Sequence, residues 1–392
     1  MKSEVIITDG HWRKSLAAVR ALGKKGIKTT VGESTRVATS MFSKYCRRAF
    51  VYPSPVHRPL EFIDFMENVL RRGNCQMFLP MEDETLVLIS ENHSIFSRWT
   101  YLPFVSSDKL AFARSKDRVL QLAETKGIPI PKTWYIESLA QLDELIDSLP
   151  YPVVIKPKTG SGALGVSYIK QKQDLKKRYL SIHRQYPYPL IQERIPAEGA
   201  GYGVSLLFDE NSTVKASFVH KRLREYPVSG GASTFRESIQ NDEIRDMAVS
   251  LLKDLGWFGV AMVEFKQDPR DGVLKLMEIN PRFWGSLSLA IASGVNFPYL
   301  LYKMSKGERF KPVENYKIGV KCRWLLPGDL LHFIYNQDRV RLIPEFFNFT
   351  DPNTHYDILS LDDPLPVLGR ALTLLTFLYD RDIKHRMRMR KI

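Results

Sequence analysis

The chain has 392 residues, which is long enough for two or three domains around a large buried core. Its 57 lysines and arginines exceed its 43 aspartates and glutamates, so the net charge is +14 at neutral pH. This charge lies in separate clusters, at residues 13–28, 170–184, 220–224 and 384–391, and no nucleic-acid-binding motif accompanies them. We therefore expect anionic small molecules, and not nucleic acid, as partners.

The cysteines and the hydropathy pattern indicate a cytoplasmic protein. Cys46, Cys75 and Cys322 lie far apart and form no CxxC motif, so we expect reduced thiols. The chain opens with a strand pattern and not with a leader peptide, and no apolar run approaches the ~20 residues of a transmembrane helix. The apolar segment 367–378 and the basic end KHRMRMRKI leave two alternatives open. A docked terminal helix with a solvated tail is the commoner arrangement, and peripheral contact with an anionic membrane surface is the other.

The first hundred residues alternate between strand and helix patterns. Strands are predicted at residues 5–8, 27–31, 76–79 and 103–107, and helices at 15–22, 59–72 and from residue 84 onward. This order predicts an α/β domain with a parallel sheet and right-handed crossovers that ends near Asp108. The first turn, TDGHWRK, lacks the GxGxxG of a dinucleotide site. The acidic residues Glu82, Asp83 and Glu84 follow a strand, where they either cap the next helix or contact a substrate amine.

A single helix is predicted at residues 109–126, and it contains Lys116, which alone is an ordinary surface lysine. Beyond it, a glycine-rich loop at residues 159–166 joins two strands predicted at 153–156 and 167–170. Because a strand and not a helix follows the loop, a Rossmann site is excluded. A flexible hairpin whose backbone N–H groups close over phosphates fits better, with Lys156 placed to contact a phosphate oxygen. A mobile hairpin tip is the alternative for the loop taken alone.

The next segment combines a polar strand with a basic cluster. The strand LIQERI at residues 190–195 can present backbone groups to a base, and Gln192 and Glu193 supply polar side chains. An antiparallel pair is predicted at 204–208 and 214–220. Four basic residues in the segment 220–224 then lead into the loop SGGAST. Such a loop suits an anionic substrate, and a solvated loop is the alternative.

Residues 259–285 predict a hairpin that carries acidic side chains in apolar strands. If the turn DPRDG closes about Asp271, Glu264 lies opposite Glu278. Facing carboxylates are destabilising unless a cation lies between them, and Glu264, Glu278 and Asn280 offer hard oxygen ligands that suit Mg²⁺ together with substrate phosphates. Arg282 adds a fixed cation for an anion. The alternative, an edge hairpin with solvated glutamates, is disfavoured by the apolar flanks.

In order and spacing, these motifs resemble the ATP-grasp superfamily, which includes biotin carboxylase, carbamoyl-phosphate synthase and D-alanine–D-alanine ligase, over about residues 5–307. The resemblance implies a Rossmann-like pre-ATP-grasp domain at residues 1–108 and a two-lobed ATP-grasp domain of α+β type at 109–310, with a lid lobe at about 130–192. A C-terminal extension at 311–392 does not resemble the C-terminus of biotin carboxylase. The SGGAST loop and the Asp-Gly start look closer to an uncharacterised branch of predicted carboxylate–amine ligases.

The resemblance also implies a role for individual residues. Arg282 and Lys156 are expected to be catalytic. From the basic cluster that enters the SGGAST loop, our own hypothesis is that Arg222, Gly230 and Gly231 help bind the carboxylate substrate. Glu264, Glu278 and Asn280 are expected to bind the metal. ATP binding is expected at Lys116, Lys156, Gly160, Ser161, Gly162, Gly165, Gln192, Glu193, Arg194, Ile195 and Glu198. Glu198 stands in for a ribose-binding acid, because Gly201 occupies the place where many members carry one.

The chemistry that the resemblance implies is ATP-dependent phosphorylation of a carboxylate to an acylphosphate, which an amine then attacks. The expected cofactors are ATP with one or two Mg²⁺ ions, or Mn²⁺ in their place, and the partners are a small carboxylate and a small amine. Two alternatives stay open: a carboxylase or carbamoyl-phosphate type of enzyme that uses bicarbonate, and an ATP-binding scaffold without catalysis. The oligomeric state is left open.

Overall fold

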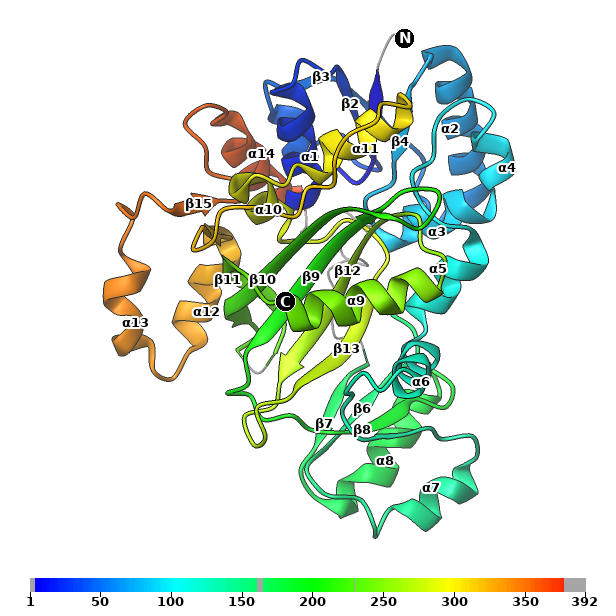
Figure 1. Ribbon diagram of the computed structural model, residues 1–392, viewed down its shortest axis with the longest axis vertical. Helices are drawn as coiled ribbons and strands as arrows, with labels where there is room; N and C mark the ends of the chain where they lie inside the picture. Colours follow the sequence, from blue (N-terminus) through cyan, green and yellow to red (C-terminus); the bar gives the residue numbers. More distant parts are fainter. Residues whose placement is uncertain (1–3, 161–164, 229, 377–392) are drawn as a thin grey trace.

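The structure is a computed structural model and describes residues 4–160, 165–228 and 230–376. Three β-sheets are seen in this part of the chain, each accompanied by helices (Figure 1). A parallel sheet is formed near the N-terminus, a seven-stranded sheet lies at the centre, and a small antiparallel sheet forms a lobe at the bottom of Figure 1. This mixed architecture with an N-terminal parallel sheet confirms the predicted α/β fold class.

The N-terminal sheet has the strand order β3-β2-β1-β4, and all its pairs are parallel. Its elements are β1 (Val5–Ile7), α1 (Arg13–Gly23), β2 (Thr29–Glu33), the 3-10 helix η1 (Thr39–Phe42), β3 (Cys46–Val51), α2 (Pro59–Gly73), β4 (Met77–Leu79), α3 (Asp83–Glu91) and α4 (His93–Phe96). Strand β3 was not predicted because it is an edge strand with two exposed arginines and no fully buried residue. The strand predicted at 103–107 is wrong: Phe104 forms only an isolated bridge to Gly259, and Pro103 has no N–H to donate to a ladder.

Two helices connect this sheet to the lid lobe, where a single one was predicted at 109–126. They are α5 (Ser107–Arg114) and α6 (Lys116–Thr125). The break falls at Ser115, which has an extended backbone and a hydroxyl that donates to Asp117. Serine competes with the helix by making such local hydrogen bonds. The break puts Lys116 in the first turn of α6, with its N–H bonded to the carbonyl of Lys158 at 2.7 Å.

The lid lobe has the strand order β5-β8-β6-β7, with α7 (Leu139–Leu145) and α8 (Lys172–His183) packed against it. Its strands are β5 (Thr133–Trp134), β6 (Val153–Lys156), β7 (Ser167–Ile169) and β8 (Leu190–Glu193). The hairpin expected around the glycine loop is present, because Val153 pairs with Ile169 and Ile155 with Ser167. The glycine loop therefore leaves and re-enters the lobe at one edge of its sheet.

The central sheet has the order β13-β12-β9-β10-β11-β14-β15. Its strands are β9 (Gly201–Phe208), β10 (Val214–Tyr226), β11 (Ala232–Ile239), β12 (Gly259–Gln267), β13 (Leu274–Asn280), β14 (Lys321–Arg323) and β15 (Thr354–Tyr356). One face packs on α9 (Asp242–Asp254), and the other packs on α1, α10 (Leu287–Ser293) and α11 (Phe297–Ser305). The predicted strand at 214–220 continues through the basic segment to the end of β10, and the second half of the predicted SGGAST loop belongs to β11, which leaves a short connection that includes Gly230 and Gly231.

The C-terminal extension adds β14 and β15 to the central sheet and so is not a separate layer. It also contains the π-helical turn η2 (Leu325–Asp329), α12 (Leu330–Tyr335), α13 (Arg339–Phe346) and α14 (Leu365–Thr376). Three buried aspartates join it to the rest: Asp329 pairs with Arg224, Asp357 with Arg236, and Asp363 with Arg20. In the described part of the chain, no helix has the length and apolarity needed to cross a membrane.

Candidate active site

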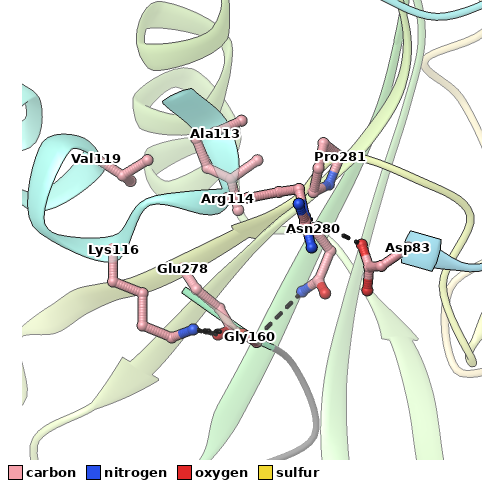
Figure 2. Close-up of a pocket in the computed structure, with 10 residues that line it drawn as sticks. Asp83, Ala113, Arg114, Lys116, Val119, Gly160, Glu278, Asn280 and Pro281 are labelled. Carbon is pink, nitrogen blue, oxygen red and sulfur yellow. Dashed lines mark hydrogen bonds and ion pairs between the residues drawn. The ribbon is translucent and has the colours of Figure 1, made fainter. Parts of the chain in front are cut away.

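Two carboxylates face each other on the hairpin β12–β13, in the register that the sequence predicted. Glu264 is the direct cross-strand partner of Glu278. The side-chain amide of Asn280 donates to Glu264 Oε1 at 3.0 Å and to Glu278 Oε1 at 3.4 Å. A β-bulge follows Glu264, so Phe265 pairs with Leu276. The three oxygen-bearing side chains thus form one group on the β12–β13 hairpin, and Figure 2 shows two of them, Glu278 and Asn280.

Each carboxylate is held by a cation from another element. Arg222 of β10 contacts Glu264 Oε2 through NH2 at 2.5 Å, and Lys116 of α6 contacts Glu278 Oε2 through Nζ at 3.3 Å. Burial raises the pKa of Glu264 above its ordinary value in spite of Arg222. Burial also opposes ionisation of Glu278, but Lys116 and Lys156 outweigh it and keep the pKa of Glu278 below its ordinary value. The two facing glutamates therefore differ in how readily they carry charge.

Lys156 ends β6 and reaches toward the same group. Its Nζ donates to Gln192 Oε1 at 2.6 Å, and the Gln192 amide donates in turn to Thr133 Oγ1 at 2.8 Å. Burial lowers the pKa of Lys156 to about 8, partly offset by Glu278. Gln192 is almost fully buried, so its side chain orients Lys156 and is not presented to solvent.

The glycine loop begins directly over the hairpin. Lys116 Nζ donates to the carbonyl of Gly160 at 2.8 Å, in addition to its contact with Glu278. Figure 2 shows these side chains around a pocket between α5, α6 and β13. Gly165, where the described chain resumes, has φ +65°, and a Cβ there would lie 2.6 Å from Pro157. The predicted ATP-binding residues Ser161 and Gly162 lie outside the described residues.

The predicted adenine-binding strand is tied into the protein by its side chains. The Glu193 carboxylate accepts hydrogen bonds from Arg270 at 2.8 Å, from Lys275 at 2.9 Å and from the N–H of Lys132 at 2.9 Å. Arg194 stacks over the ring of Tyr168 at 5.2 Å. Ile195 is buried, and Glu198 is exposed in the turn before β9. The Glu193 side chain is therefore committed to ion pairs between β8 and the β12–β13 turn.

Arg282 has a buried partner that the sequence did not reveal. Its Nε donates to Asp83 Oδ2 at 2.8 Å, and its NH1 donates to the carbonyl of Phe283 at 3.1 Å. Burial disfavours the charged forms of both groups, but their mutual attraction is stronger. The pKa of Arg282 is therefore raised, and that of Asp83 is held well below its usual range. Arg114 lies 3.8 Å from the other Asp83 oxygen. The sequence feature that could have pointed to this partner is the position of Asp83 after β4, at the edge where open α/β sheets bind ligands.

The residues expected to bind the substrate adjoin Glu264. Arg222 NH1 donates to Glu225 Oε1 at 3.1 Å and to the carbonyl of Gly231 at 3.4 Å. The N–H of Gly231 donates to Glu225 Oε2 at 3.3 Å. A Cβ on Gly230 would lie 3.4 Å from the hydroxyl of Tyr168 on β7. This group thus lies between the central sheet and the lid lobe.

The oxygen donors fit a magnesium ion that is bound together with phosphates. In the described residues, no group of three or more His, Cys, Asp or Glu side chains is placed to hold a metal. Two carboxylates and one amide oxygen form an incomplete, hard ligand set, and Mg²⁺ is typically held by one or two carboxylates plus water and substrate phosphates. Lys116 and Arg222 balance the two acids in this structure.

The chain matches known proteins in sequence and in structure. The family described as "ATP-grasp in the biosynthetic pathway with Ter operon" matches residues 198–325. A D-aspartate ligase from Enterococcus faecium is 24% identical over 256 residues, which cover 59% of this chain and 61% of that protein. The chain thus spans less than two thirds of this relative.

Solved structures of the same fold include the biotin carboxylase domain of a 2-oxoglutarate carboxylase from Hydrogenobacter thermophilus, in complex with MgADP, ADP and bicarbonate. Its TM-score is 0.66 at 13% identity, with 82% of this chain and 74% of that chain covered. An L-amino acid ligase from Bacillus licheniformis has a TM-score of 0.60 at 16% identity, with coverage of 78% and 75%. These matches in sequence and in fold confirm the resemblance to the ATP-grasp superfamily that the order of the motifs predicted.

Proposed function

We propose that the protein is an ATP-dependent ligase that phosphorylates a carboxylate and transfers the acyl group to an amine. The observation that carries this proposal is the group Glu264, Glu278 and Asn280, bordered by Lys116 and by the start of the glycine loop. Similarity to a D-aspartate ligase and an L-amino acid ligase supports an amino acid as one substrate. The free thiols Cys46, Cys75 and Cys322 support a cytoplasmic location.

Glu264, Glu278 and Asn280 would hold one or two Mg²⁺ ions, or Mn²⁺, in the complex with ATP. The bound ion supplies charge neutralisation on the phosphates. Lys116 and Lys156 contact phosphate oxygens after exchanging their present partners, Glu278 and Gln192, for the nucleotide. Little covalent chemistry is needed from the protein, because positioning and electrostatic stabilisation dominate phosphoryl transfer.

Arg282 stabilises the charge that develops on the transferring phosphoryl group, and Asp83 holds its guanidinium in place. Loss of one such contact costs about 3 kcal/mol of transition-state stabilisation. Ser161, Gly162 and Gly165 belong to the loop that covers the phosphates and excludes water from the acylphosphate. Gly160 starts this loop, and Arg194, Ile195 and the backbone of Gln192 and Glu193 border the adenine.

Arg222, with Gly230 and Gly231, binds the carboxylate substrate in this proposal. Arg222 now bridges Glu264 and Glu225, and one side of its guanidinium would be available for a substrate anion if Glu264 held a metal ion. Glu198 contacts the ribose if the turn before β9 shifts toward the nucleotide. The small carboxylate and the small amine stay unnamed.

A bicarbonate-using reaction is the second candidate, because the biotin carboxylase domain above was solved with bicarbonate. The ligase and the bicarbonate-using reaction are distinguished by measuring ADP release from Mg·ATP, with pools of carboxylates and amines in one assay and with bicarbonate alone in another. Our proposal predicts ADP release only when a carboxylate and an amine are both present. Release with bicarbonate alone would favour the carboxylase, and ATP binding without release under any condition would identify a scaffold.

A further inference from the structure

The junction between α5 and α6 places two cations in the same pocket. Arg114 is the last residue of α5 and Lys116 is the first of α6, and Ser115 between them has an extended backbone. Side chains two residues apart do not face each other in a continuous helix, but across an extended residue they point to one side. Arg114 and Lys116 both line the pocket that Glu278 and Asn280 border. The helix break thus adds a second cation to this pocket.

Arg114 is held less tightly than the neighbouring cations Lys116 and Arg282. Its Nε lies 3.8 Å from Asp83 Oδ1, which is too far for a hydrogen bond, and Figure 2 shows the side chain extending from α5 toward Asp83. Within the residues that the structure describes, the guanidinium has no closer polar partner. Its side chain is 30% exposed, compared with 15% for Lys116 and 9% for Arg282. An anion that binds in the pocket therefore attracts this guanidinium without breaking a hydrogen bond.

Asp83 stays paired when Arg114 leaves it. Its other oxygen accepts a hydrogen bond from Arg282 Nε at 2.8 Å. Burial opposes ionisation of Asp83, but Arg282, Lys14 and Arg114 overcome it, in that order of strength, and hold its pKa well below the usual range. Removal of Arg114 therefore withdraws the weakest of the three cations and leaves no unpaired buried charge. The contact between Arg114 and Asp83 is thus exchangeable.

A phosphate group is the anion that fits Arg114. Glu278 and Asn280, which belong to the proposed metal and phosphate group, line the same pocket. A guanidinium presents a planar fork of N–H donors that matches two phosphate oxygens. Arg114 and Arg282 share Asp83 as a counter-ion, and each lies beside a different oxygen of that carboxylate. Arg114 is therefore placed to contact the same phosphoryl group as Arg282.

We propose that Arg114 is a further catalytic residue, whose guanidinium exchanges Asp83 for the phosphoryl group that is transferred from ATP. This inference rests on the proposed ligase function for the identity of the phosphoryl acceptor. In the transfer, a carboxylate oxygen forms a bond to the γ-phosphorus, the bond from that phosphorus to the bridging oxygen breaks, and ADP keeps the electron pair. No proton moves in this step. Arg114 stabilises the charge on the non-bridging oxygens, as Arg282 does.

The test compares two affinities of the full-length protein by calorimetry: for MgADP alone, and for MgADP with aluminium fluoride, which imitates a phosphoryl group in transfer. We expect the wild type to bind the second combination more tightly. Arg114→Gln should keep the wild-type affinity for MgADP and lose roughly 10²-fold in affinity for MgADP with aluminium fluoride. Arg118→Gln, at an exposed arginine of α6 outside the pocket lining, is the matched control and should bind both like the wild type. Thermal unfolding checks that all variants remain folded.

Three outcomes of this comparison would overturn the proposal. The first is that the wild type binds MgADP equally well with and without aluminium fluoride. The second is that the folded Arg114→Gln variant has both wild-type affinities. The third is that this variant loses the same factor in both affinities, which would assign Arg114 to the bound nucleotide and not to the transferred group.

A purely positioning role, in which Arg114 only holds Asp83, is tested in the Asp83→Asn background. If Arg114 contacts the phosphoryl group, adding Arg114→Gln to Asp83→Asn lowers the affinity for MgADP with aluminium fluoride further. No further loss would mean that Arg114 acts only through Asp83, and the proposal would be wrong. The ligase function is tested separately by ADP release with the carboxylate and amine pools. Absence of that release would contradict the ligase, while the aluminium fluoride measurement, which needs no acceptor, still tests Arg114.

Discussion

At the level of single residues, the site is a set of charges that compensate one another. Glu264 is paired with Arg222, Glu278 with Lys116, and Asp83 with Arg282. To bind here, a nucleotide and its metal ion must replace one partner in these ion pairs. The free energy of binding is therefore a difference between two sets of ion pairs, and it depends on pH wherever one member titrates.

The facing glutamates could be predicted from the sequence, but the partner of Arg282 could not. Alternation of side chains along a strand and a short turn fix which residues of a hairpin face each other, so Glu264 and Glu278 followed from the turn. Asp83 lies 199 residues from Arg282 in the chain. Only the docking of the N-terminal sheet on the central sheet brings these two side chains together.

Lys156 is the residue whose titration should control nucleotide affinity. Because burial lowers its pKa to about 8, its ammonium is charged below that pH and becomes neutral above it. ATP needs the charged form, so above pH 8 binding must take up a proton and the dissociation constant should rise, by up to ~10-fold per pH unit. Calorimetric titration with ATP between about pH 7 and about pH 9.5 measures this change.

The variant Lys156→Arg is the control for this titration. A guanidinium stays charged over the whole range, so the affinity of the variant should change little with pH, even if it is lower overall. If both proteins lose affinity with the same pH dependence, Lys156 is not the titrating group and its contact with the phosphates is wrong.

At the level of elements, local patterns predicted some strands and missed others, and they did not reveal the helix break. Strand β6 was predicted with its observed bounds because a short apolar run between turn residues has few alternatives. The break at Ser115 lies within a helical pattern, and the docking of Lys116 against residues 158–160 accompanies the local hydrogen bond of Ser115. The first half of β11 was mistaken for a loop because its small residues Ala232, Ser233 and Thr234 directly follow Gly230 and Gly231, although pairing with β10 makes it a strand.

Substitution of Gly165 should disturb the glycine loop more than its positive φ alone would cause. Gly127, which has nearly the same φ, is the comparison. Gly165 has φ +65°, and a Cβ on it would collide with Pro157 and crowd Tyr186. Gly127 has φ +66° and no atom within 4 Å of such a Cβ. Both substitutions to alanine carry the cost of a left-handed backbone, roughly 1–2 kcal/mol. Only Gly165→Ala should also displace the loop.

We therefore expect Gly165→Ala to weaken ATP binding roughly 10- to 100-fold, because a displacement of about 1 Å in a positioning element can cost this much. Gly127→Ala should keep wild-type affinity with a lower melting temperature. Calorimetric ATP binding and thermal unfolding of the two variants measure this difference. Equal ATP affinities in the two variants would mean that the loop does not contact the nucleotide.

At the level of the whole molecule, the C-terminal extension is part of the folded body. Its strands extend the central sheet, and its buried aspartates reach arginines on β10, β11 and α1. None of these contacts was predictable, because each aspartate stands in an irregular stretch without periodicity. A charge that is buried with its partner stabilises the fold only while both members are present.

Removal of one such aspartate should unfold the molecule more readily. Asp357 is fully buried between Arg236 and Arg13, so Asp357→Asn should lower the free energy of unfolding by roughly 3–5 kcal/mol. Asp362→Asn, in an exposed ion pair with Lys44, is the control and should leave the unfolding midpoint nearly unchanged. Urea denaturation of both variants measures the free energy and the midpoint of unfolding. A similar midpoint for both would show that the extension is only loosely attached.

The central claim is that the β12–β13 hairpin forms the metal and phosphate site of an ATP-dependent ligase. It is tested most directly by ADP release from Mg·ATP, with the carboxylate and amine pools, in the wild type, in Glu278→Gln and in Glu137→Gln, an exposed glutamate of the lid lobe. We predict that Glu278→Gln loses about 10²- to 10³-fold in rate with an unchanged melting temperature, and that Glu137→Gln matches the wild type. Wild-type ADP release by Glu278→Gln would contradict the account.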